Sequence, residues 1–126
     1  MLGKVSPADL TEHVFGKTGA SLDSVLQGPA YGEDAAAIEV ESGTLVVSSD
    51  PISLAIDQVG TLGIYVACND IAASGGDPTW LESVIFLPGS DDPEAALDRI
   101  TDQMDEAARN LGVSIVGGHS EYNPAL

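Results

Sequence analysis

Polar clusters interrupt apolar stretches of this chain at four places, and their side chains are of the types that bind cations and phosphates. In chain order they are Gly32-Glu33-Asp34, Ser48-Ser49-Asp50, Asn69-Asp70 and Gly117-Gly118-His119-Ser120-Glu121. Carboxylate oxygens are hard ligands that suit Mg²⁺, and protein-bound Mg²⁺ commonly binds substrate phosphates as well. Consecutive glycines leave backbone N–H groups open to an anion. A metal-assisted phosphate site is therefore the chemistry to weigh against simpler explanations.

Asp70 is the most informative of these residues, because it is the only charged residue between Gln58 and Gly76. We expect a largely buried helix over residues 58–74, where an ionised carboxylate is costly unless it is paired or bound to metal. Lys and Arg together number only 4 in the chain, so an ion pair is a poor explanation. The alternative is that Asp70 lies near the helix end and is partly solvated. The residues alone favour neither interpretation.

Asp34 and Asp50 are expected to be neighbours across a hairpin. Residues 35–41 and 44–49 are typical of strands, and Ser42-Gly43 between them suits a tight turn. That register places Asp34 beside Asp50 at the open end of the hairpin. Two adjacent carboxylates repel unless a cation or a shared proton lies between them. On spacing alone, however, chance and plain solvent exposure explain such a pair better in a chain so rich in acids.

The last cluster and the single cysteine carry less information by themselves. Gly117-Gly118 follows a short apolar stretch, and a plain turn is the commoner explanation of such a pair. His119 could be a ligand or a structural side chain, and lone histidines are usually structural. Cys68 excludes an internal disulfide and is better explained as a small buried hydrophobe than as a reactive thiol.

The charge of the chain excludes several partners. It has 20 acidic and 4 basic residues, a formal net charge of −16, which repels nucleic acid and anionic membranes. A solvating acidic surface, as in halophilic proteins of a salt-rich cytoplasm, accounts for most of the acids, and a cation site accounts for those that converge. No apolar run reaches membrane-spanning length, and residues 1–7 do not resemble a secretory signal. We therefore expect a soluble, cytoplasmic protein.

The elements that must position the clusters follow from caps and periodicity. Helices are predicted from Ser6 to about Gly16, over residues 58–74, and from the capping Asp92 to Gly112. Residues 79–87 and 113–116 add two strands to the hairpin, while residues 16–32 are predicted to be loop. This order predicts one α/β (α+β) domain, a four-stranded sheet with helices on one face. Its open edges invite pairing with a second copy.

Taken together, the clusters resemble a known family in their order and spacing. The matching segments are Tyr31–Ile38, Val47–Ile52, Ala67–Gly75 with Pro78 and Trp80, and Ile115–Glu121. They resemble the PurM-like superfamily, which includes AIR synthase, selenophosphate synthetase, thiamine-monophosphate kinase, formylglycinamidine amidotransferase and HypE. The resemblance is greatest to AIR-synthase-related proteins of the HypE type, and it covers roughly residues 30–121. Each motif is modest alone, but four in register are specific.

The resemblance implies a fold and a site. The PurM N-terminal-like domain pairs its four-stranded sheet with that of a second copy into an eight-stranded barrel, and ATP and Mg²⁺ bind beside it. By matching position, Asp34, Asp50 and Asp70 resemble the metal ligands. The remaining nucleotide-binding positions implied by the family are Gly32, Ser49, Asn69, Gly117, Gly118 and His119. Family kinases and HypE often carry Asp where His119 stands, and Glu121 is a weaker candidate.

The function implied is phosphorylation of an amide, formyl or carbamoyl oxygen by ATP. Family members continue into a second domain, so residues 1–126 are expected to be an ATP-binding and dimerisation domain of a ligase- or dehydratase-type enzyme, inactive alone. A hydrogenase-maturation protein is a candidate partner. Two alternatives stay open: a phosphotransferase domain like that of thiamine-monophosphate kinase, and a dimerisation module that binds no nucleotide.

Overall fold

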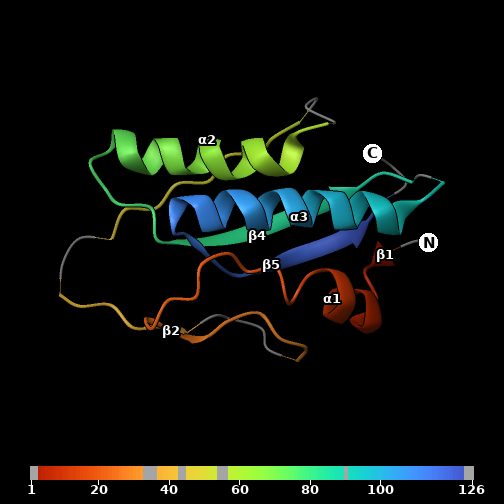
Figure 1. Ribbon diagram of the computed structural model, residues 1–126, viewed down its shortest axis with the longest axis horizontal. Coiled ribbons are helices and arrows are strands. Elements are labelled where there is room, and N and C mark those ends of the chain that lie inside the picture. Colours follow the sequence, from red (N-terminus) through yellow and green to blue (C-terminus); the bar gives the residue numbers. More distant parts are fainter. Residues whose placement is uncertain (1–2, 33–36, 43–44, 54–56, 90, 124–126) are drawn as a thin grey trace.

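The computed structural model describes residues 3–32, 37–42, 45–53, 57–89 and 91–123. Within these ranges the elements are β1 Gly3–Lys4, α1 Pro7–His13, β2 Val25–Gln27, β3 Ala37–Ile38, α2 Val59–Ala73, β4 Trp80–Leu87, α3 Pro93–Leu111 and β5 Ser114–Tyr122. Figure 1 shows α2 lying along α3, and α3 lying over β4 and β5. The β2–β3 ribbon lies on the other side of the view. Among the described helices, none is long and apolar enough to span a membrane.

The central sheet confirms the mixed α/β class. Its strand order is β1-β5-β4, with β4 and β5 parallel and β1 antiparallel to β5. The chain passes from β4 to β5 through α3, which is the helical crossover that a parallel pair requires. The described residues thus form a three-stranded sheet and a separate two-stranded ribbon, instead of the expected four-stranded sheet.

The predicted hairpin between residues 35–41 and 44–49 is wrong within the described residues. The strand β3 pairs with β2, with Val25 opposite Ile38, and residues 45–49 form no strand. The glycines of residues 16–32 predict a loop there, so the sequence gives no signal for β2 as the partner of β3. A local turn signal such as Ser42-Gly43 permits a hairpin, but it does not exclude pairing with a more distant strand.

The three predicted helices are confirmed, and the predicted caps are present on α1 and α3. The Asp9 N–H donates to Ser6 Oγ at 3.1 Å at the start of α1, and the Ala95 N–H donates to Asp92 Oδ1 at 3.0 Å at the start of α3. Gly112 ends α3 with a φ of +70°, which glycine adopts without strain. These helix ends could be predicted from the sequence because the residues that form a cap lie within one turn of each other.

The core lies between α3 and one face of the sheet. Its members include Ile85 and Leu87 of β4, Leu97, Met104, Ala107 and Ala108 of α3, and Ile115 and Tyr122 of β5. Each fully buried aliphatic side chain contributes about 1.5–3 kcal/mol relative to exposure. The other face of β4 is open, since Val84 and Phe86 are 63% and 51% exposed. One sheet face is therefore covered, and the other presents apolar side chains.

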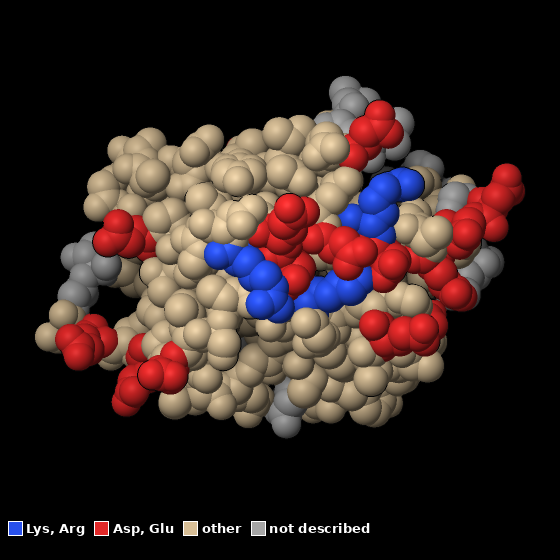
Figure 2. Space-filling model, in the orientation of Figure 1, with Lys and Arg blue, Asp and Glu red and all other residues tan. Residues whose placement is uncertain are grey.

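Helix α1 and the turn after it are attached to α3 by charge. Lys17 Nζ lies 2.5 Å from Asp98 Oδ1 and 2.7 Å from Asp102 Oδ1, and Thr101 Oγ1 donates to the His13 carbonyl at 2.9 Å. Figure 2 shows basic side chains with acidic ones on either side of them on this face of the molecule. The acids of α3 are thus partly neutralised by basic residues, although the chain as a whole is strongly negative.

Candidate functional site

The second and third polar clusters meet near the C-terminal end of α2. The Ser48 hydroxyl donates to Asp70 Oδ2 at 3.0 Å, across 22 positions of the sequence. A Cβ atom on Gly76, just beyond the helix, would lie 3.5 Å from the Cβ atom of Val46, so the chain is closely packed there as well. Residues 46–48 therefore run against the end of α2. This contact joins two clusters that the sequence could connect only by resemblance.

Of the two interpretations of Asp70 that the sequence leaves open, the structure confirms the second, in which Asp70 is solvated near the helix end. Asp70 and Asn69 are exposed, and burial in α2 falls on Gly60, Ile64 and Cys68. The helix is apolar on more than one face, but only one face packs against α3, so Asp70 lies on a face turned to solvent. Burial of the Asp70 carboxylate therefore gives no support for a bound metal ion. Its exposure instead leaves the carboxylate accessible to a cation without a large desolvation penalty.

Ser49 and Asp50 directly follow the contact residue Ser48, and both are exposed. They do not end a strand, because residues 45–53 have no strand structure. Within the described part of the chain, no group of three or more His, Cys, Asp and Glu side chains is placed to hold a metal ion. Metal binding by Asp50 and Asp70 stays a prediction.

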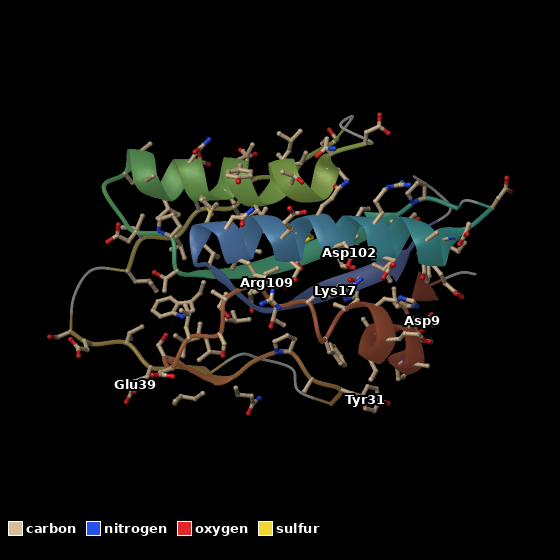
Figure 3. The ribbon with its side chains drawn as sticks, in the orientation of Figure 1. Asp9, Lys17, Tyr31, Glu39, Asp102 and Arg109 are labelled. Carbon is tan, nitrogen blue, oxygen red and sulfur yellow. The ribbon has the colours of Figure 1, made fainter. Side chains whose placement is uncertain are left out.

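The first cluster is described only in part. Gly32 is exposed and has a φ of +86°, a conformation that other residues adopt only with strain. Asp34 lies outside the described residues, and so does its predicted place beside Asp50. Figure 3 shows Tyr31 and Glu39 on the side of the view opposite to α2, with α3 and the sheet between. The described residues thus join the second cluster to the third, but not the first.

The glycine pair of the fourth cluster lies inside a strand and not in a turn. In the parallel ladder Gly118 is opposite Ser83, and His119 is opposite Val84. A Cβ atom on Gly118 would overlap the backbone of Ser83, and its φ is +146°. These glycines therefore permit close approach of two strands, a non-local requirement that the turn rule does not consider. Contact of Gly117, Gly118 and His119 with phosphate stays a prediction.

His119 contacts Glu121, the weaker candidate for a role in the site. Its Nε2 atom lies 3.0 Å from Glu121 Oε2, and Asn123 Nδ2 donates to Glu121 Oε1 at 3.4 Å. The Phe86 ring meets the imidazole edge-on, with centroids 6.3 Å apart. The contacts with Glu121 and Phe86 fix the orientation of the His119 ring on the side of the sheet that α3 does not cover.

Cys68 and Trp80 lie outside the contacts described above. Cys68 is a buried free thiol, and burial raises its pKa, which agrees with the predicted role of a small hydrophobe. Trp80 Nε1 donates to Ser24 Oγ at 3.1 Å, joining the start of β4 to the residue before β2. In the sequence, Trp80 stands out only as part of the family resemblance. No spacing rule links it to Ser24, which lies 56 positions away.

The comparisons with known proteins agree with the fold. The family model described as "AIR synthase related protein, N-terminal domain" matches residues 32–125. The chain belongs to this family, which confirms the resemblance that its four polar clusters indicate. A crystal structure of hydrogenase maturation protein HypE superimposes with a TM-score of 0.61 at 25% identity, over 96% of this chain.

Two kinds of curated relative are similar in sequence. Selenide, water dikinase of Nitratidesulfovibrio vulgaris is 30% identical over 98% of this chain, and carbamoyl dehydratase HypE of Rhizobium leguminosarum bv. viciae is 34% identical over 71% of it. The chain spans 37% and 27% of these two proteins and 35% of the HypE crystal structure. It therefore corresponds to about a third of its relatives' length.

Proposed function

We propose that this chain is the ATP- and Mg²⁺-binding N-terminal domain of a HypE-like, AIR-synthase-related protein. Its reaction would be phosphorylation of an amide, formyl or carbamoyl oxygen, and the similarity to carbamoyl dehydratase HypE supports the last of these. The observation that carries the proposal is the hydrogen bond from Ser48 to Asp70. It joins the second polar cluster to the third at one place on the surface.

The Ser48–Asp70 contact suits metal binding. The hydroxyl engages Oδ2 and so restrains the carboxylate, while Oδ1 accepts no hydrogen bond from the described residues. Asp50 follows two residues after Ser48 and offers a second carboxylate to the same Mg²⁺. A cation held there would neutralise charge on a transferring phosphoryl group, in a reaction that depends mostly on positioning. The other predicted nucleotide-binding positions, Gly32, Asp34, Ser49, Asn69, Gly117, Gly118 and His119, belong to this proposal through the family resemblance.

We also propose that the domain acts as a homodimer. The strand β4 is an edge of its sheet, and the side that α3 does not cover presents Val84 and Phe86. Two neighbouring apolar side chains exposed on one open sheet face suit contact with another chain. A second copy that paired with this edge would remove the unsatisfied edge groups and cover these side chains.

The test of nucleotide binding is a thermal shift with Mg²⁺-ATP. A ligand at 100 times its Kd stabilises by about 2.7 kcal/mol, which raises the Tm of a domain this size by roughly 10 °C. Asp70→Asn removes the charge that attracts the cation, so we expect it to abolish most of the shift. Asp91→Asn makes the same change at an exposed acid outside the four clusters, and it should keep the shift. A wild-type chain whose Tm ignores Mg²⁺-ATP contradicts the proposal.

Two other functions have specific support. A phosphotransferase is favoured by the selenide, water dikinase relative, which aligns with 98% of this chain. It predicts the same Mg²⁺-ATP shift, and it differs from the HypE-like function in the acceptor that receives phosphate. A dimerisation module without nucleotide is the other candidate, and the open edge of the sheet at β4 supports it. It predicts a dimer in sedimentation experiments and no shift with Mg²⁺-ATP.

A further inference from the structure

The side of the sheet that α3 does not cover carries a histidine–carboxylate pair beside its two exposed apolar side chains. In the parallel ladder Val84 is opposite His119 and Phe86 is opposite Glu121, so the four side chains lie on one face. Val84 and Phe86 are exposed, and the rings of Phe86 and His119 meet edge-on. A second copy that covers the two apolar side chains therefore covers the pair as well.

His119 and Glu121 form a dyad that is oriented before any partner binds. His119 Nε2 lies 3.0 Å from Glu121 Oε2, and Asn123 Nδ2 donates to the other carboxylate oxygen at 3.4 Å. Both side chains of the dyad are partly exposed, so solvent can supply or remove a proton. Histidine is the side chain that ordinarily changes charge between pH 5 and 8. Uptake of one proton changes the dyad from one negative charge to none, whichever of the two residues holds it.

The strands on either side of the dyad contribute two further charged residues. Glu82 of β4 is opposite Gly117, and its Oε1 atom would lie 3.4 Å from a Cβ atom on that glycine. Lys4 of β1 is opposite Glu121 in the antiparallel register. Glutamate and lysine ordinarily titrate well outside pH 6–8, and their opposite charges offset each other. Among the described residues of these three strands, the dyad therefore decides whether this face is negative or neutral near neutral pH.

Covering this face makes the negative charge of the unprotonated dyad unfavourable. A carboxylate that is tolerated in water becomes costly when it is buried without a positive partner. In a two-fold dimer both copies present the same surface, so two negative dyads would be covered together. Like charges repel, and each chain already has a formal net charge of −16. The protonated dyad is neutral as a whole and hydrogen-bonded internally, so it reduces both costs.

We propose that the His119–Glu121 dyad makes homodimer formation depend on pH, because each copy takes up a proton when this face is covered. This rests on the homodimer of the proposed function, and it is independent of nucleotide binding. The dimer then binds more protons than two free chains do, so it is favoured as the pH falls and weakened as the pH rises. One proton for each dyad changes the dissociation constant at most about tenfold per pH unit, or about a hundredfold for two.

The test is the dissociation constant of the dimer, measured by sedimentation equilibrium without nucleotide at pH 6, 7 and 8 and at constant ionic strength. For the wild type we expect dimerisation to be roughly tenfold or more tighter at pH 6 than at pH 8. His119→Gln keeps a hydrogen-bonding side chain that does not titrate, so its constant should change little over this range. Glu121→Gln removes the negative charge, so its dimer should be tighter than that of the wild type at pH 8 and should not tighten further at pH 6.

The second histidine of the chain provides a matched control. His13 Nδ1 lies 3.3 Å from Asp98 Oδ1 of α3, the helix that covers the opposite side of the sheet. His13→Gln removes the same titratable group from a place outside the proposed interface, and it should keep the pH dependence of the wild type. Phe86→Asp places a charge in the apolar part of the interface and should abolish the dimer at every pH.

The outcomes separate the two proposals. If the wild type is monomeric at every pH, the homodimer fails and this inference fails with it. If the wild type dimerises equally tightly at pH 6 and pH 8, or if His119→Gln keeps the full pH dependence, only the role of the dyad is overturned. A dimer that persists in Phe86→Asp uses another surface and equally overturns it. Where His119→Gln does not fold, Glu121→Gln decides, and a wild-type pH dependence in that variant is a contradiction.

Discussion

Two regions of this molecule are organised in opposite ways. The unit formed by α3, β4 and β5 encloses most of the buried core, with Leu97 fully buried and Ile115 only 7% exposed. The described residues between 25 and 53 contain one short ribbon and a segment without helix or strand, whose Leu45 and Val47 are 65% and 81% exposed. The first region is a packed scaffold, and the second carries two of the four polar clusters. The buried core therefore lies in the scaffold, while half of the polar clusters lie outside it.

The largest expected effect of a substitution lies in the scaffold. Leu97→Ala removes a fully buried side chain from α3, which should lower the free energy of unfolding by about 2–5 kcal/mol. The matched change in the other region, Val47→Ala, removes an 81% exposed side chain and should cost less than about 0.5 kcal/mol. Urea denaturation of both variants measures the difference. Similar losses from the two substitutions would contradict the division into scaffold and site.

A smaller but still clear effect is expected at the strand contact of the scaffold. Gly118→Ala places a methyl group against the backbone of Ser83 at a φ of +146°, so we expect a loss of about 1–3 kcal/mol. Gly16→Ala is the control, because a Cβ atom there meets nothing within 4 Å. If Gly118→Ala melts at the wild-type temperature, the close approach of β4 and β5 is not needed, and the turn predicted from sequence regains support.

This division also explains what the sequence could predict. The helices α1 and α3 were predicted with their caps because Ser6, Asp92 and Gly112 act within a single turn. The pairing of β2 with β3 was missed, and so was the continuation of the predicted strand 113–116 through Gly118 to Tyr122, because both depend on partners outside the local sequence. Pattern reasoning measures local propensity, and strand pairing is decided by distant contacts.

The candidate site follows the same rule. The residues of the candidate site could be selected from the sequence by their types and by the family resemblance, and their roles stay predictions. The exposure and the contacts of these residues could not be predicted from the sequence. The sequence left burial and solvation of Asp70 open because α2 is apolar all round, and the structure decides for solvation because only one face of that helix packs against α3. The contact from Ser48 to Asp70 and the contact from Trp80 to Ser24 join separate segments and have no local signal.

The smallest expected effect concerns the charges that attach α1 to α3. Burial acts to lower the pKa of Lys17, but hydrogen bonds to Asp102 and Asp98 outweigh it and leave that pKa raised. The bonds from Lys17 and from His13 lower the pKa of the Asp98 carboxyl. Asp98 is 46% exposed and solvent screens such pairs, so Lys17→Met should cost only about 0–1 kcal/mol at neutral pH.

The sign of the pH dependence makes this small effect measurable. A carboxyl whose pKa is lowered by folding stabilises the protein above the unfolded value, about 3.9, and this contribution is lost as the pH falls through the lower folded value. The Tm difference between wild type and Lys17→Met should therefore stay constant from pH 7 to about 5 and shrink below about pH 4. Arg109→Met, which removes a pair with Asp105 inside α3 alone, should cost less, because that pair joins no two elements. A Tm difference that grew as the pH fell would show that Lys17 does not stabilise the attachment of α1 through Asp98.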